Sequence, residues 1–216
     1  SLVSETATDV DWFADNMADT IVVTATDNYG IKGYEFGYGS VPGITSSAWT
    51  LADTNTAALD ITTLLEGELY YSNVRVKDLT GQVANGSSDG FRVDRTPPVA
   101  GTVEVASDAD SVLVKWAGFS DALSGLKSYH YSLMESAVAE PIIAPTNIGR
   151  VDSVKFKIQD LVLGTTYYVI LTAVDTAGNH TEVWSNFVYD LIPGSPTIVT
   201  VSQASGTKLN IMNNQT

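Results

Sequence analysis

The 216-residue sequence has no cysteine, only two histidines, and no apolar run of the roughly 18 residues needed to span a membrane. Without cysteine, thiol catalysis, thiolate zinc sites and redox chemistry are excluded. The sequence also lacks His-Glu-x-x-His, Gly-x-Ser-x-Gly, P-loop and dinucleotide-binding glycine motifs. His130 falls on the polar side of an expected strand and His180 follows an expected turn, neither beside such a motif. We therefore expect the chain not to be an enzyme, and no cofactor is certain.

Basic residues are also scarce, because 11 Lys and Arg stand against 25 Asp and Glu, for a net charge of −14. This balance argues against nucleic-acid binding, which depends on basic side chains that neutralise phosphates, and against insertion into anionic membranes. It suits a soluble extracellular or cell-surface protein and one that binds divalent cations, although acidic charge often serves solubility alone. Residues 1–11 lack the charged start and apolar run of a signal peptide, as a fragment of a longer precursor also would.

The apolar residues that are present alternate with polar ones, which is the pattern of half-buried β-strands. In the second half of the chain, Val112, Val114 and Trp116 alternate with Leu113 and Lys115. Similar alternation occurs over residues 129–133, 154–158 and 167–173, and over 21–25, 34–38 and 70–76. No segment shows a stripe of 3.6-residue period, so the sequence predicts an all-β protein with almost no helix.

An internal repeat sets the domain organisation. Residues 61–82 and 158–179 align without gaps at an offset of 97 positions. The matched pairs are Ile61/Ile158, Leu64/Leu161, Gly67/Gly164, Tyr70/Tyr167, Tyr71/Tyr168, Asp78/Asp175 and Gly81/Gly178. Further along, Phe91 and Asp94 pair with Phe187 and Asp190. This period is the size of one immunoglobulin-like β-sandwich.

Proline-rich segments mark the boundaries of the repeat. Residues 94–98 read Asp-Arg-Thr-Pro-Pro, and residues 192–196 read Ile-Pro-Gly-Ser-Pro at the equivalent place. Proline removes amide donors and stiffens the chain into an extended form. We therefore predict one sandwich over residues 1–95 and a second over 96–192. Residues 193–216 are expected to form a two-strand tail or the start of a further module, paired with the second sandwich or with a neighbouring chain.

The second sandwich resembles a fibronectin type III domain. Val114-Lys115-Trp116 resembles that family's second strand, and residues 161–167 resemble its Leu-x-Pro-Gly-Thr-x-Tyr corner, with Leu163 where proline is usual. The resemblance implies that the Tyr167 ring packs inward while its hydroxyl bonds the preceding loop. The first sandwich resembles a bacterial immunoglobulin-like repeat in residues 24–31 and 94–98. Both resemblances imply antiparallel sandwiches from large bacterial surface or secreted proteins, a setting in which the missing inter-sheet disulfide is ordinary.

Such sandwiches bring the loop after the second strand and the loop after the sixth strand to one pole. In the second sandwich these loops carry Asp121, Asp175 and Asn179, and the linker adds Asp94 at the same pole. Calcium prefers several hard oxygen ligands, so these four residues are candidate calcium ligands. Asp27 and Asp78 occupy the equivalent loops of the first sandwich. The alternative is that these Asp and Asn residues only shape turns by bonding nearby amides.

Three functions follow from this organisation. The first is a non-catalytic structural or adhesive stalk segment of a bacterial extracellular or cell-surface protein, self-assembling by strand addition if the tail pairs with a neighbouring copy. The second is a set of accessory spacer or binding modules in an extracellular carbohydrate-active enzyme. The third is a receptor-binding module, marked by an exposed apolar patch. The expected partners are other modules of the same protein, neighbouring copies, or a carbohydrate or protein surface. The aromatic candidates for that surface are Tyr29, Trp49, Tyr168 and Trp184.

Overall fold

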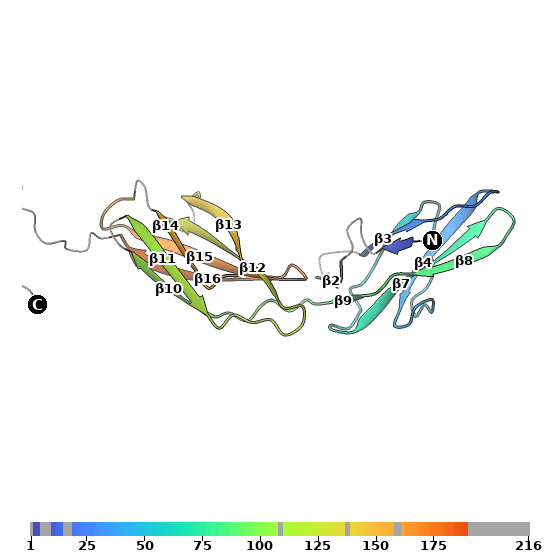
Figure 1. Ribbon diagram of the computed structural model, residues 1–216, viewed down its shortest axis with the longest axis horizontal. Coiled ribbons are helices and arrows are strands. Elements are labelled where there is room, and N and C mark those ends of the chain that lie inside the picture. Colours follow the sequence, from blue (N-terminus) through green and yellow to red (C-terminus); the bar gives the residue numbers. More distant parts are fainter. Residues whose placement is uncertain are drawn as a thin grey trace, which may run out of the picture.

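The computed structural model describes residues 2–4, 10–14, 19–107, 110–136, 139–157 and 161–189. The described chain is all-β and forms two sandwiches that lie end to end along the long axis of the molecule (Figure 1). The predicted class, tandem antiparallel β-sandwiches without helix, is thereby confirmed over these residues. The expected tail at 193–216 and Asp190 lie outside them.

The described residues of the first sandwich form nine strands. One sheet has the order β1-β3-β6, from β1 (Leu2–Ser4), β3 (Asp19–Thr24) and β6 (Thr56–Leu59). The other has the order β2-β9-β7-β4-β5, with β8 also paired to β7. Its strands are β2 (Trp12–Phe13), β4 (Ile31–Gly39), β5 (Thr50–Ala52), β7 (Leu69–Asp78), β8 (Val83–Ser87) and β9 (Phe91–Val93). Two groups of buried side chains fill it, Ile21, Val23, Phe36 and Val74 in one and Phe13, Ile61, Phe91 and Val93 in the other.

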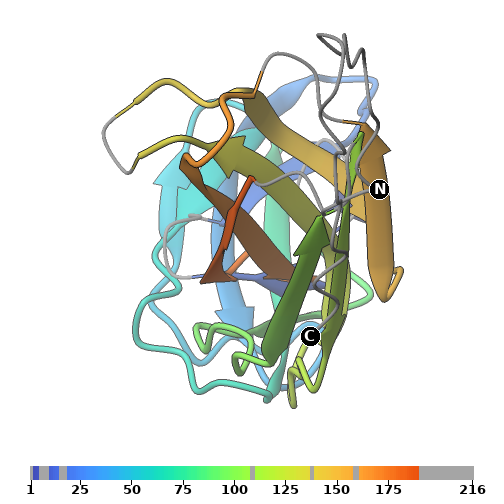
Figure 2. The same cartoon turned by 90° about the vertical axis from the view of Figure 1, so that its left-hand side faces the viewer.

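In the second sandwich, seven strands lie within the described part of the chain. The sheet β10-β11-β14 comprises β10 (Thr102–Ser107), β11 (Ser111–Ala117) and β14 (Ser153–Lys157). It faces the sheet β13-β12-β15-β16, which comprises β12 (Leu126–Met134), β13 (Ile143–Gly149), β15 (Thr166–Asp175) and β16 (His180–Val188), as Figure 2 shows end-on. Val112, Val114 and Trp116 are buried between the sheets while Lys115 is exposed, as the alternation in the sequence predicts.

A tyrosine corner occurs in both sandwiches at the repeated tyrosine. The Tyr167 hydroxyl accepts a hydrogen bond from the Val162 amide at 2.8 Å, and its ring is buried. The Tyr70 hydroxyl accepts one from the Leu65 amide at 3.1 Å. Each hydroxyl therefore ties the end of its ring to the loop five residues upstream, which confirms the role that the resemblance implied for Tyr167 and extends it to Tyr70.

Candidate functional site

The linker between the sandwiches is bonded to the first sandwich through Arg95 and Glu66. The Arg95 guanidinium donates to the carbonyls of Leu64 at 2.7 Å and Ile61 at 2.8 Å, both in the tyrosine-corner loop. The Glu66 carboxylate accepts hydrogen bonds from the Arg95 amide at 2.7 Å and the Thr96 hydroxyl at 3.2 Å. Charge-assisted bonds of this kind are shorter and stronger than neutral ones, so they fix the direction in which the linker leaves.

The same linker is bonded to the second sandwich. The Asp94 carboxylate accepts a hydrogen bond from the Ser124 amide at 2.9 Å. The Thr181 hydroxyl donates to the Pro98 carbonyl at 2.6 Å, and Val99 forms an antiparallel bridge with Ser120. Asp94 is fully buried and Pro98 is buried, although both belong to a connecting segment. The linker therefore contributes to the packing of both sandwiches.

Three carboxylates meet where the linker enters the second sandwich. One oxygen from each of Asp94, Asp121 and Asp175 lies within 4.8 Å of the other two, and this is the one such grouping among the described residues. Asp121 comes from the loop between β11 and β12, and Asp175 from the end of β15. Calcium–oxygen distances of about 2.3–2.6 Å place two ligands of one ion up to about 5 Å apart. The spacing of these three oxygens therefore fits a shared calcium ion.

Hydrogen bonds hold these carboxylates in place. Asp121 accepts from the amides of Leu123 at 3.1 Å and Gly125 at 2.7 Å, and Asp175 accepts from the amide of Gly178 at 2.7 Å. Burial raises the pKa of the Asp175 carboxyl above its ordinary value, and the charge of Asp94 raises it further, although hydrogen bonds from its own turn oppose the shift. The negative charges at this point thus repel one another, and a divalent cation would relieve that repulsion.

Asn179 lies in the same cluster but faces it with its amide nitrogen. Its Nδ2 donates to an Asp175 carboxylate oxygen at 2.9 Å and to the Asp94 carbonyl at 2.8 Å. Among the residues expected to bind calcium, Asn179 therefore acts in this arrangement as a hydrogen-bond bridge between the linker and the β15–β16 turn.

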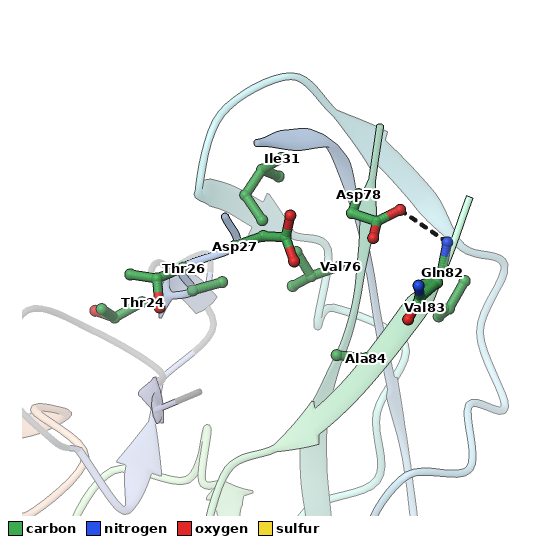
Figure 3. Close-up of a pocket in the computed structure, with 10 residues that line it drawn as sticks. Thr24, Thr26, Asp27, Ile31, Val76, Asp78, Gln82, Val83 and Ala84 are labelled. Carbon is green, nitrogen blue, oxygen red and sulfur yellow. Dashed lines mark hydrogen bonds between the residues drawn. The ribbon is translucent and has the colours of Figure 1, made fainter. Parts of the chain in front are cut away.

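Asp27 and Asp78 lie at the other end of the first sandwich, where both line a groove (Figure 3). Burial raises the pKa of Asp78, but hydrogen bonds from Thr80, Gln82 and Gly81 outweigh this effect, and the pKa lies below its ordinary value. No third acidic residue of the described chain joins this pair to make a group like the one at the linker. The structure therefore brings together three of the expected carboxylates and leaves these two as a separate pair.

The sequence did not point to Arg95, Glu66 or Thr181 as linker-binding residues. Arg95 directly follows Asp94, and Glu66 directly precedes the repeated Gly67, so both lie beside residues that the repeat marks. Their partners are some 30 residues away or more in the sequence, and the Arg95 guanidinium donates to backbone carbonyls. Such contacts leave no pattern of residue types.

The aromatic candidates differ in exposure. Tyr29 is 67% exposed and Trp184 is 44% exposed, with the Tyr168 ring 6.3 Å from the Trp184 ring on neighbouring strands. Trp49 is covered by the Arg75 guanidinium, which lies 4.1 Å from the ring centre. The exposed Trp184 thus packs beside the half-buried Tyr168 on the β15–β16 face, whereas Trp49 is engaged within the first sandwich.

Comparison with solved structures identifies the fold. Fibronectin(III)-like modules of Clostridium thermocellum CbhA match with a TM-score of 0.56 and 14% identity, over 88% of this chain and 95% of theirs. The FN1-FN3 domains of chicken CNTN1 match with a TM-score of 0.50 and 14% identity over 83% of this chain, which spans 65% of that one. The fold is that of tandem fibronectin type III-like modules. No family model and no curated protein matches the sequence. We call residues 2–93 and 99–189 the first and second modules from here on. None of the described residues forms a helix that could cross a membrane.

Proposed function

We propose that the chain is a non-catalytic spacer in a bacterial extracellular or cell-surface protein, and that its linker holds two modules at a fixed relative orientation. One observation carries this proposal: residues 94–99 are hydrogen-bonded to both modules, with Asp94 fully buried between them. A flexible connection would leave these polar groups to water. The resemblance of the linker and the first module to bacterial repeats supports the bacterial setting.

Calcium is the second part of the proposal. An ion shared by Asp94, Asp121 and Asp175 would join the linker to two loops of the second module at once. It would also neutralise carboxylates that are held close together by their own backbone hydrogen bonds. With such an ion, the rigidity of the joint would depend on the calcium concentration around the protein.

The experiment compares the orientations of the two modules in solution. Residual dipolar couplings, measured on the full chain in millimolar calcium, give one alignment tensor per module. A rigid joint gives two tensors of equal magnitude and orientation. Arg95→Ala removes the guanidinium bonds to Leu64 and Ile61 and should make the tensors diverge, whereas Arg150→Ala, an exposed arginine of the second module, should not. Divergent tensors in the unaltered chain would refute the fixed orientation.

An accessory role beside a carbohydrate-active domain is a second candidate, favoured by the exposed Trp184 ring that lies beside Tyr168. Aromatic faces of this kind stack against sugar rings as well as against proteins. Titration of soluble β-glucan oligosaccharides into the labelled chain should shift the Trp184 indole resonance if the pair binds sugar. Trp184→Ala abolishes any such binding, and an unchanged indole resonance removes the observation that favours this role.

A further inference from the structure

The outer pole of the first module shares four hydrogen bonds with the pole of the second module that holds the linker. The Asp27 carboxylate accepts a hydrogen bond from the Tyr29 amide at 2.7 Å, as the Asp121 carboxylate does from the Leu123 amide at 3.1 Å. A second shared hydrogen bond joins each of these loops to the turn beside it. The Gly30 carbonyl accepts from the Leu79 amide at 3.1 Å, and the Gly125 carbonyl accepts from the Thr176 amide at 2.9 Å.

The turn after β7 and the turn after β15 also share their hydrogen bonds. In the first module, the Asp78 amide donates to the Gln82 carbonyl at 3.0 Å, and the Gln82 amide donates back to the Asp78 carboxylate at 2.8 Å. In the second module, Asp175 and Asn179 make the same two bonds at 3.0 and 2.8 Å. Gln82 therefore stands where Asn179 stands, and it too carries a side-chain amide.

Strand register shows which segment would reach the outer pole. Leu2 pairs with Thr24, the last residue of β3, as Thr102 pairs with Ala117, the last residue of β11. The linker residues that pack on the second module lie three to eight positions before Thr102. In a tandem array, the segment that corresponds to the linker would thus lie immediately before Leu2.

The outer pole has a groove and exposed apolar side chains. The groove has a volume of about 440 Å³ and is lined by Asp27, Ile31, Asp78 and Gln82, whose side chains gather there in Figure 3. Beside it, Tyr29 is 67% exposed and Leu79 is 65% exposed. In Figure 1 the turn between β7 and β8 lies at the end of the molecule away from the second module.

The counterpart of Tyr29 in the second module shows what such a side chain can contact. Leu123 follows the Asp121 turn as Tyr29 follows the Asp27 turn. Leu123 is 38% exposed and touches the tyrosine-corner turn of the first module, because a methyl group added at Gly67 would lie 3.3 Å from its Cδ2. Tyr29 is thus placed to contact the corner of a module that precedes the first one.

We propose that this groove is the docking site for the linker of another fibronectin type III-like module, an extended Asp-x-x-Pro segment with the chemistry of residues 94–98. The linker carboxylate lies beside Asp27 and Asp78, as Asp94 lies beside Asp121 and Asp175. The Gln82 side-chain amide donates to the carbonyl of that linker aspartate, as Asn179 does to Asp94. The inference rests on the proposed spacer function and extends it. The outer pole of the first module would receive the linker of a preceding module in the way that the second module receives residues 94–98.

The test attaches a copy of the linker to the full chain. A second copy of residues 93–101 is placed directly before Leu2, which restores the spacing found before Thr102. Tethering gives the segment a high effective concentration at the groove. Amide hydrogen exchange of Leu79 and Gln82, measured in millimolar calcium, should slow by about tenfold or more relative to the unextended chain.

Two matched controls make the result specific. An extension of equal length with Asn in place of its aspartate and Gly in place of its two prolines should leave the exchange of Leu79 and Gln82 unchanged. Gln82→Ala in the groove should reduce the protection that the native extension gives to Leu79. Equal exchange with and without the native extension overturns the proposal, and so does equal protection by both extensions. The Ser124 amide, which donates to Asp94 of the existing linker, reports separately, because its rapid exchange would refute the spacer function rather than the docking site.

Discussion

Calcium should raise the thermal stability of the second module, because Asp94, Asp121 and Asp175 are brought together only when that module is folded against the linker. Extracellular calcium modules bind with dissociation constants of about 0.1–1 mM. At about 10 mM calcium this corresponds to roughly 1.4–2.7 kcal/mol of added stability for a ligand that binds only the folded state. For a module of this size, the melting temperature should rise by roughly 6–20 °C.

Differential scanning calorimetry of the full chain, in calcium and in chelator, measures this rise. The two modules unfold as separate cooperative units unless the linker couples them, so each transition is followed separately. Asp121→Asn removes one charge and keeps an oxygen that can accept the bonds from Leu123 and Gly125, and it should abolish most of the shift. Asp152→Asn, at an exposed carboxylate outside this group of three, should leave it intact. A melting temperature that is the same in calcium and chelator, or a shift that survives Asp121→Asn, would refute the calcium site.

Three further predictions concern the stability of the fold. In chelator, the raised pKa of Asp175 means that the folded state binds its proton more tightly than the unfolded chain. The stability that this proton provides is full below the ordinary carboxyl pKa of about 3.9 and is lost as pH rises through the higher folded pKa. Denaturant titrations from pH 3 upward should show this loss of stability in the unaltered chain but not in Asp175→Asn. A free energy of unfolding that rises with pH in the unaltered chain relative to Asp175→Asn would contradict the assignment. Tyr167→Phe should cost about 1–2 kcal/mol, because Tyr167 is buried and its hydroxyl bonds the Val162 amide, and Tyr70→Phe less than about 1 kcal/mol because Tyr70 is only half-buried. Urea unfolding distinguishes the two, and equal costs would be inconsistent with this burial argument. Gly101→Ala should destabilise the second module by about 1–3 kcal/mol, since its new methyl group would clash with the Ala117 carbonyl oxygen. Gly33→Ala, whose methyl group would lie 3.7 Å from its nearest neighbour, serves as the control and should be tolerated; equal melting temperatures would contradict the packing at Gly101.

Much of the fold follows from the sequence because each module repeats a simple rule. Alternation over 112–116 and 167–173 predicted which side chains are buried, since successive residues of a strand face opposite sides of the sheet. The fibronectin resemblance implied the tyrosine corner at Tyr167, and the structure shows a second corner at Tyr70, its partner in the 97-residue repeat. The meeting of Asp94, Asp121 and Asp175 was also predictable, because sandwich topology fixes which loops share a pole.

Other features depend on contacts that no periodicity encodes. The parallel pairing of β2 with β9 joins two short strands far apart in the sequence. The guanidinium of Arg95 donates to backbone carbonyls, and these have no residue identity that a sequence pattern can mark. Asn179 was expected to offer an oxygen, but the positions of the Asp94 carbonyl and the Asp175 carboxylate call for a donor, so its nitrogen faces them. These details decide how the modules are joined, and they emerge only from the packed structure.

The double attachment of residues 94–99 has a consequence for the geometry of long arrays. If each joint between modules is the same, each module is related to the next by one rotation and one translation. Repeating a single such operation generates a helix, and its pitch and hand are set by that one step. A single residue inserted into this linker would then alter the path of the entire array, while leaving every module folded as before.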